Sequence, residues 1–175
     1  QGTFTPKYRT GHVAGKEEVL AAIGAADTCT LNALRPDQHA GTGGTLTANR
    51  LRAMLGPDEA SISVVDQDDL HVYQPGLLFI PFGLSQEMDI VRPRGRQLHA
   101  GIDFHTSAID HVELATQRVH LATGATLDYD VLVVATGATL ALDETEGLTG
   151  PGWGESVHTF YTLDGATALA HKLST

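Results

Sequence analysis

A glycine-rich turn followed by a helix, a short apolar strand and an acid constrains the fold of this chain more than any other feature. The turn is Ala40-Gly41-Thr42-Gly43-Gly44, and the helix that it opens extends to Leu55. A tight turn at Gly56-Pro57-Asp58 then separates the helix from an apolar strand, Ile62 to Val65, which runs into Asp66. This order of elements is the second half of a βαβ unit of the dinucleotide-binding type.

The turn and the helix have the properties that phosphate binding requires. Gly41 and Gly44 lack a Cβ, so a pyrophosphate could lie against the backbone and the helix could pack close to a sheet. The N-terminus of the helix offers unpaired N–H groups and a partial positive charge. Leu51, Met54 and Leu55 follow each other at helical spacing and predict a single apolar face.

Asp66 occupies the position of the ribose-binding acid. It lies 22 residues after Gly44, and the fingerprint places this acid about 20 residues further on. An Asp here favours an unphosphorylated ribose, as in FAD or NAD, over the 2′-phosphate of NADP. The alternative interpretation is an ordinary βα turn that binds no ligand.

The residues before the turn depart from the pattern. His39 stands where the fingerprint has its first glycine, and Leu34 to Gln38 stands where a buried strand should lie, although Pro36 cannot donate to a sheet. Cys29 to Leu34 is a poor strand candidate, so we expect no central strand before Ala40 and weak FAD binding as a result. We therefore expect an irregular segment at 1–38, with a short helix over Lys16–Ala26, and a domain over 39–173.

Composition excludes several classes of function. The net charge of −10 disfavours nucleic acid as a partner, because phosphodiesters would be repelled. A single cysteine, Cys29, excludes a disulfide framework and a CxxC pair within this chain; it is either a catalytic thiol or a small buried hydrophobe. The nine histidines form no HxH, HxxH or HExxH pair, so we expect no metal site. We see no signal peptide and no membrane span.

Two segments after Asp66 allow alternative interpretations. The stretch from Leu70 to Leu84 is apolar but contains Pro75 and Pro81, which indicates either a ligand-facing loop or core packing. Arg92, Arg94 and Arg96 form a basic run that is typical either of an anion site or of a solvated face.

The second half of the chain predicts a small β-meander and a further parallel strand. Arg118–Leu121 and Thr126–Tyr129 flank a Thr-Gly-Ala turn and predict a hairpin. The apolar run Val131–Ala135, followed by Thr136-Gly137, predicts a buried parallel strand that ends in a tight turn. A glycine-rich loop follows, and Thr162 to Leu173 predicts a helix.

These motifs together resemble a known family. Ala40 to Leu173 resembles the FAD-binding part of the FAD-dependent pyridine nucleotide–disulfide oxidoreductases, and is most similar to sulfide:quinone oxidoreductases. The resemblance rests on the glycine turn, the Val64-Val65-Asp66 strand end, the loop Tyr73 to Leu78 and the run Asp130 to Ala138. It implies an α/β fold: a Rossmann-like FAD-binding domain with a small antiparallel β-meander, incomplete at both ends.

The resemblance also implies a cofactor, an FAD site and a reaction. The glycine turn would hold the FAD pyrophosphate, Asp66 the adenosine ribose and the backbone near Ala108 the adenine; the segment after the last strand would close over the cofactor, and the Tyr73 to Leu78 loop would approach the flavin ring. The implied FAD-binding residues are Gly41, Thr42, Gly43, Gly44, Asp66, Gln74, Pro75, Ala108, Ala135, Thr136 and Gly137.

Members of the family oxidise sulfide and pass electrons through FAD to a quinone. The family's redox cysteines and second nucleotide motif are missing here, so we expect an FAD-binding fragment without turnover of its own and no catalytic residue within it. The full-length protein would be cytoplasmic with peripheral contact to the inner membrane. The alternatives are a type II NADH:quinone oxidoreductase-like flavoprotein and a non-catalytic remnant of a nucleotide-binding fold.

Overall fold

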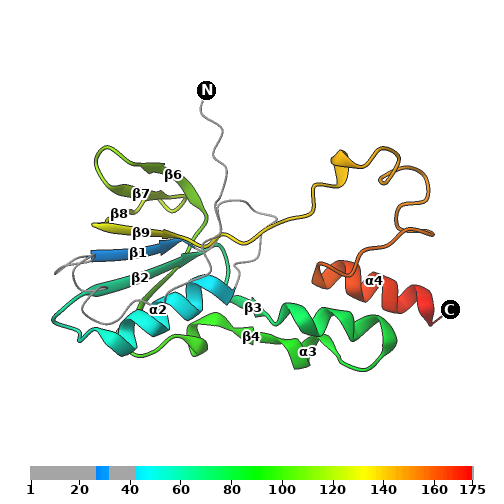
Figure 1. Cartoon of the computed structure of the whole chain (residues 1–175), viewed down its shortest axis with the longest axis horizontal. Helices are drawn as coiled ribbons and strands as arrows, with labels where there is room; N and C mark the ends of the chain where they lie inside the picture. Colours follow the sequence, from blue (N-terminus) through cyan, green and yellow to red (C-terminus); the bar gives the residue numbers. More distant parts are fainter. Residues whose placement is uncertain (1–26, 32–41, 175) are drawn as a thin grey trace, which may run out of the picture.

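The computed structural model describes residues 27–31 and 42–174. Figure 1 shows two groups of elements: a sheet with α2 and a β-meander at the left, and a smaller group of short helices with α4 at the right. The helix expected over Lys16–Ala26 lies outside the described residues. The expected boundary near residue 39 falls between the first described strand and the first described helix, also outside them.

Four parallel strands form the central sheet, in the order β5-β2-β1-β9 (Figure 1). Their bounds are β1 Asp27–Leu31, β2 Ser61–Asp66, β5 Asp103–Thr106 and β9 Val131–Val134. Leu31 lies opposite Val65 on one side and Val134 on the other, while Asp66 lies opposite Thr106. The chain therefore extends the sheet from β1 in both directions, first through β2 and β5 and later through β9.

The position of β1 corrects the expectation that no residue before Ala40 supplies the central strand. That expectation was wrong, because Asp27–Leu31 pairs with both β2 and β9. The fingerprint spacing places the strand directly before position 39, where Pro36 and two charged residues are unsuitable. The sheet uses an earlier segment, Asp-Thr-Cys-Thr-Leu, which contains no proline and includes two β-branched threonines.

Helix α2, Thr42–Met54, covers one face of the sheet as the helical spacing predicts. Ala48 and Leu51 are buried against Ile62 and Val64 of β2, and Leu55 beyond the helix end closes the same cluster. Met54 is only half-buried at its edge. Because Ile62 and Val64 alternate along β2, they share one face of the strand, and Val65 faces the other way.

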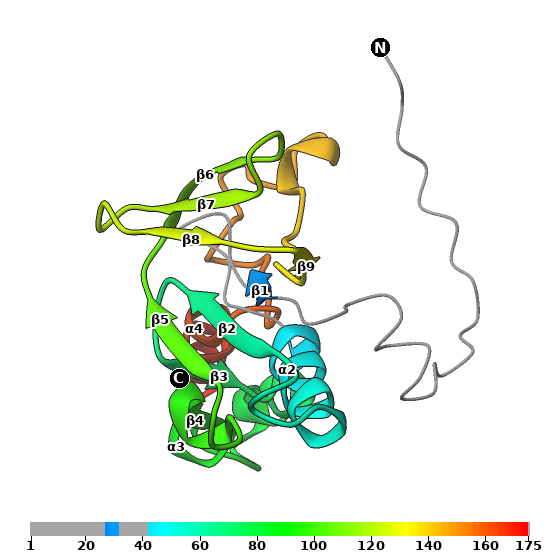
Figure 2. The same ribbon diagram turned by 90° about the vertical axis from the view of Figure 1, so that its left-hand side faces the viewer.

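The β-meander covers the opposite face, so the larger group has three layers (Figure 2). Its strands are β6 Ile109–Glu113, β7 Arg118–Leu121 and β8 Thr126–Asp128. The expected hairpin is confirmed, because β7 and β8 pair antiparallel around the turn that contains Gly124. Val65 packs into a core with residues of the meander and its flank: Ile109, Val119, Leu121 and Tyr129.

The smaller group is built from the segment after Asp66 and from the C-terminal helix. Its elements are β3 Leu70–Val72, η1 Gln74–Leu78, η2 Ile80–Phe82, α3 Glu87–Ile90, β4 Val91–Pro93 and α4 Leu163–Leu173. After β4, η3 Arg94–Gln97 lies against α2, where Nδ2 of Asn49 donates to the carbonyl of Gln97, and η4 Leu142–Glu144 lies on the loop after β9. Strands β3 and β4 are antiparallel. The side chains of Leu77, Ile80 and Ile90 are buried together with Ala166 of α4. Pro75 and Pro81 begin two 3₁₀-helices in place of a strand.

Helix α4 confirms the expected C-terminal helix and is capped by the residue before it. The hydroxyl of Thr162 accepts a hydrogen bond from the backbone N–H of Gly165 at 3.1 Å. Lys172 near its end pairs with Glu155 of the preceding loop at 3.1 Å. These two contacts attach the helix to the long loop that leaves β9.

Close packing around Gly76 leads to a prediction. A Cβ on Gly76 would clash with Cγ2 of Ile90, which is buried in the core of the smaller group. We expect Gly76→Ala to lower the free energy of unfolding by about 1–3 kcal/mol, the usual cost of overpacking. Gly95→Ala is the matched control, because its Cβ would come no closer than 3.5 Å to another atom. Urea denaturation in which both variants unfold alike would contradict this packing.

Candidate functional site

The carboxyl ends of the parallel strands and the N-terminus of α2 meet at one edge of the sheet. This edge faces the smaller group of elements (Figure 1). A Cβ built on Gly43 would lie 3.9 Å from Cβ of Ala135, so the first turn of α2 lies beside the end of β9. Because strands are added on both sides of β1, the sheet has its topological switch point here, where open α/β sheets bind their ligands.

The first turn of α2 provides a positive electrostatic environment at this edge. Of the predicted glycine turn, Gly41 lies outside the described residues, while Thr42, Gly43 and Gly44 form the start of the helix. Thr42 and Gly43 are exposed, and Gly44 is buried against the sheet. No acidic residue occupies the first turn of α2, so no carboxylate of that turn offsets the partial positive charge of the helix N-terminus.

Three further predicted residues follow β9 directly. Ala135 and Thr136 are half-buried and Gly137 is exposed, with a φ of 75° that favours glycine. The strand before them was expected to be buried, but its side chains are half-buried and Val134 is 59% exposed. β9 is at the end of the described sheet order, which explains the difference.

Asp66 is the last residue of β2, as predicted, and its side chain is fully buried. The backbone N–H of Ser107 donates to the carbonyl of Asp66 at 2.7 Å, which brings Ala108 next to the strand end. The carbonyl of Ala108 accepts from the N–H of Ala122 and from the hydroxyl of Ser107. The structure thus brings the residues predicted for ribose and adenine close to each other.

Arg94 was not assigned to this site from the sequence, although it is part of the basic run. Its Nε lies 2.6 Å from Oδ2 of Asp66 in an ion pair without hydrogen-bond geometry, and both side chains have no exposed surface. Its guanidinium also donates to the hydroxyl of Thr45 in the first turn of α2 at 2.9 Å and to the carbonyl of Leu70 at 2.7 Å.

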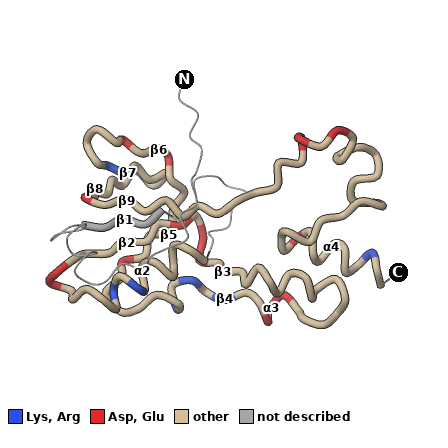
Figure 3. The backbone as a smooth tube through the Cα atoms, in the orientation of Figure 1, with Lys and Arg blue, Asp and Glu red and all other residues tan. Residues whose placement is uncertain are grey.

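The sequence left two interpretations open for the basic run, and a solvated face does not describe Arg94, which is fully buried. That interpretation holds for the exposed Arg92 and Arg96, which stand on either side of it. Figure 3 marks basic residues along α2 and β4. Arg94 follows β4 directly and contacts α2 through the hydroxyl of Thr45. The three arginines alternate in the sequence with the same spacing. Nothing in that pattern indicates which of them is buried beside Asp66.

Burial dominates the electrostatics of Asp66. It raises the pKa of Asp66 from 3.8 to about 6; Arg94 lowers this pKa, Asp68 raises it, and the backbone N–H groups of Gln67 and Asp68 lower it. Burial also lowers the pKa of Arg94. The pKa of His71 is lowered by burial and by the charge of Arg94. Because the pKa of Asp66 in the folded chain is above its unfolded value, ionisation reduces stability as the pH rises from about 4 to 6.

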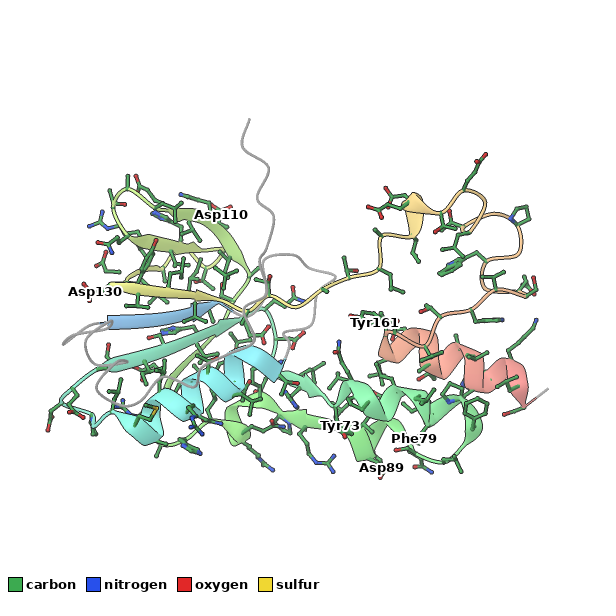
Figure 4. All side chains as sticks on the ribbon, in the orientation of Figure 1. Tyr73, Phe79, Asp89, Asp110, Asp130 and Tyr161 are labelled. Carbon is green, nitrogen blue, oxygen red and sulfur yellow. The ribbon has the colours of Figure 1, made fainter. Side chains whose placement is uncertain are left out.

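The remaining predicted residues, Gln74 and Pro75, lie at the start of η1 in the smaller group. They border a pocket of about 250 Å³ whose lining is Gln74, Pro75, Leu77, Leu78, Phe160 and Tyr161. Figure 4 shows Tyr161 on the segment that leads into α4, facing the η1 side of the group. The segment Leu70–Leu84 is thus both core and pocket wall: Leu77 and Ile80 are buried, whereas Leu78 and Phe79 are exposed.

The aromatic wall of this pocket was not found from the sequence. Phe160 and Tyr161 are far from Gln74 in the chain, and the long loop after β9 brings them there. Two adjacent aromatic residues within a glycine-rich loop are the only sequence signal that they gave.

The described residues contain no group of three or more His, Cys, Asp or Glu side chains arranged to hold a metal ion. In the same part of the chain, none of the helices has the length and apolarity needed to cross a bilayer. Cys29 lies within β1.

Known proteins resemble this chain over part of their length. No protein-family model matches it. It is 32% identical over 153 residues to the alternative NAD(P)H-ubiquinone oxidoreductase C1, chloroplastic/mitochondrial, of Arabidopsis thaliana, a match that covers 77% of this chain and 28% of that protein. The chain is similar to one part of the FAD-dependent pyridine nucleotide–disulfide oxidoreductases.

Solved structures of these flavoproteins share the fold. The sulfide:quinone oxidoreductase of the hyperthermophilic bacterium Aquifex aeolicus matches with a TM-score of 0.67 and 21% identity, over 85% of this chain and 31% of that one. The NAD-dependent persulfide reductase from A. fulgidus matches with a TM-score of 0.63 and 23% identity, over 85% of this chain and 28% of that one. The chain spans less than a third of each relative's length, and has the Rossmann-like fold and meander expected from its sequence.

The site residues are compatible with FAD. Oδ1 of Asp66 is buried and has no hydrogen-bond partner among the described residues, so it remains an acceptor for a donor such as a ribose hydroxyl. The first turn of α2 and the end of β9 adjoin at the same sheet edge. Because Asp66 has no exposed surface, its surroundings must rearrange for a ribose to reach Oδ1.

Proposed function

We propose that this chain is the FAD-binding part of a flavoprotein oxidoreductase that passes electrons to a quinone. The observation that carries the proposal is the buried carboxylate of Asp66 at the end of β2, held beside the first turn of α2 at the switch point of the sheet. The parallel strands and α2 are the elements that the dinucleotide fold uses for an ADP moiety. FAD, when bound, supplies two-electron redox chemistry.

The residues of this chain would hold different parts of FAD. The first turn of α2, from Thr42 to Gly44, would face the pyrophosphate, and Asp66 would accept a hydrogen bond from the adenosine ribose. The backbone near Ala108 would border the adenine. The segment Ala135–Gly137 would cover the cofactor.

Gln74 and Pro75 would approach the flavin ring. Their pocket is suited to a flat, largely apolar group, because aliphatic and aromatic side chains form most of its lining.

The names of two similar proteins support a quinone as the electron acceptor. The Arabidopsis relative is an NAD(P)H-ubiquinone oxidoreductase, and the Aquifex structure is a sulfide:quinone oxidoreductase. The electron donor of the full-length protein is then sulfide or a reduced nicotinamide nucleotide. Our sequence-based hypothesis is sulfide, and the Arabidopsis relative, an NAD(P)H-ubiquinone oxidoreductase, favours a reduced nicotinamide nucleotide as the second candidate. Quinone reduction by the full-length protein with each donor in turn decides between them.

The titration of Asp66 provides a prediction for FAD binding. Ionised Asp66 is the better hydrogen-bond acceptor for a ribose hydroxyl, so we expect FAD affinity to fall by about tenfold between pH 7 and pH 5, across its pKa of about 6. Asp66→Asn should bind FAD more weakly at pH 7 and lose this pH dependence. Quenching of flavin fluorescence measures both constants. A pH profile that is the same in the variant would remove Asp66 from the site.

A further inference from the structure

Arg94 connects three segments that meet at the end of β2. It contacts Asp66 at the strand end, Thr45 in the first turn of α2 and the carbonyl of Leu70 at the start of β3. Its backbone is fixed as well, because its N–H donates to the carbonyl of Asp69 at 2.9 Å. The N–H of Gly95 donates to the carboxylate of Asp69 at 2.7 Å. These contacts to Asp66, Thr45 and Leu70 hold the Arg94 side chain in one orientation.

The two oxygens of the Asp66 carboxylate have different surroundings. Oδ2 lies 2.6 Å from Nε of Arg94, whereas Oδ1 is buried and without a hydrogen-bond partner among the described residues. The backbone N–H groups of Gln67 and Asp68 also act on the carboxylate and lower the pKa of Asp66. A buried acceptor without a donor is unfavourable, so Oδ1 is the atom at which a ligand hydroxyl gains most.

We propose that Arg94 is the positioning residue of the ribose site: it occupies Oδ2 of Asp66, so that the carboxylate accepts one ribose hydroxyl through Oδ1 and not both. This inference rests on the proposed function, since it concerns the same site. We assign Arg94 no contact with the ribose, because its guanidinium is already engaged by Asp66, by the hydroxyl of Thr45 and by the carbonyl of Leu70. It acts by holding the carboxylate in one orientation and by keeping it ionised.

Several charged groups around Asp66 act on its pKa and on that of Arg94. Asp68 raises the pKa of Asp66 and Arg94 lowers it. Asp66, Asp68 and Asp69 all raise the pKa of Arg94 against the effect of burial. Buried His71 does not add a positive charge, because burial and Arg94 both lower its pKa. Arg94 is therefore the cation that offsets the burial of Asp66 among the described residues.

The first test uses the unaltered chain and ADP analogues that compete with FAD. One of 2′-deoxy-ADP and 3′-deoxy-ADP should bind about ten- to a hundredfold more weakly than ADP, and the other should bind within about twofold of it. A loss of similar size for both analogues would mean that the carboxylate accepts both hydroxyls, and the proposal would be wrong. No loss for either analogue would also overturn it. If neither FAD nor ADP binds the chain, the proposed function fails before this question arises.

The second test separates positioning from a merely structural role. In Arg94→Met the pKa of Asp66 should rise, so FAD affinity should fall at pH 7 and recover as the pH is raised further. Arg94→Lys keeps the charge and should retain a pH midpoint near that of the unaltered chain. A purely structural role would lower affinity by the same factor at every pH, and that result would contradict the proposal. Where Arg94→Met cannot be purified folded, the analogue measurement and Arg94→Lys still decide.

Discussion

Replacing Arg94 by methionine is expected to lower the free energy of unfolding by about 3–5 kcal/mol, because it leaves the carboxylate of Asp66 buried without its partner. The hydrogen bonds to Thr45 and Leu70 are lost in the same variant, so α2 and β3 lose their common attachment. Urea denaturation followed by circular dichroism measures the change. This is one of the two largest effects that we expect from a single substitution.

Two further variants show whether the ion pair is the cause. Arg96→Met is the matched control, because Arg96 is exposed in η3, and it should change the unfolding free energy by about 0.5 kcal/mol or less. In the double variant Asp66→Val with Arg94→Met, both charges are gone and much of the lost stability should return. Equal stability of Arg94→Met and Arg96→Met would show that the buried pair contributes little.

The second large effect is expected at the packing of α2 on the sheet. Leu51→Ala should lower the free energy of unfolding by about 2–5 kcal/mol, because Leu51 is buried against Ile62 and Val64. Leu46→Ala is the matched control in the same helix: Leu46 is 62% exposed, so its replacement should cost about 0.5 kcal/mol or less. Both substitutions have the same effect on helix propensity, so their difference reports burial alone. Similar losses in the two variants would contradict this orientation of α2.

The elements that could be predicted from the sequence are those with a complete local signal. The glycine turn and the apolar spacing of Leu51 and Leu55 identified α2, and the run to Asp66 identified β2 and its acid. The turn around Gly124 identified a hairpin, and Thr162 marked the start of α4. In each case the residues that determine the element are neighbours in the chain.

Features that depend on distant partners could not be predicted in this way. β1 is a short segment with two threonines, and its role comes from pairing with β2 and β9. Arg94 resembles its neighbours Arg92 and Arg96 in the sequence, and only the fold brings it into an ion pair with Asp66. Phe160 and Tyr161 reach the pocket of Gln74 through the loop after β9. The residue types in a sequence indicate which chemistry is available. The three-dimensional contacts decide which of several residues of the same type belongs to the site.

We expect this chain to bind FAD through its adenosine part, at the end of β2. The most direct measurement is a titration of the purified chain with FAD, ADP and FMN by isothermal titration calorimetry at pH 7. We predict that FAD and ADP each bind at one site, that FMN, which lacks the adenosine, does not compete, and that Asp66→Asn weakens FAD by about ten- to a hundredfold. Absence of FAD binding, or FMN binding as tightly as FAD, would contradict the claim.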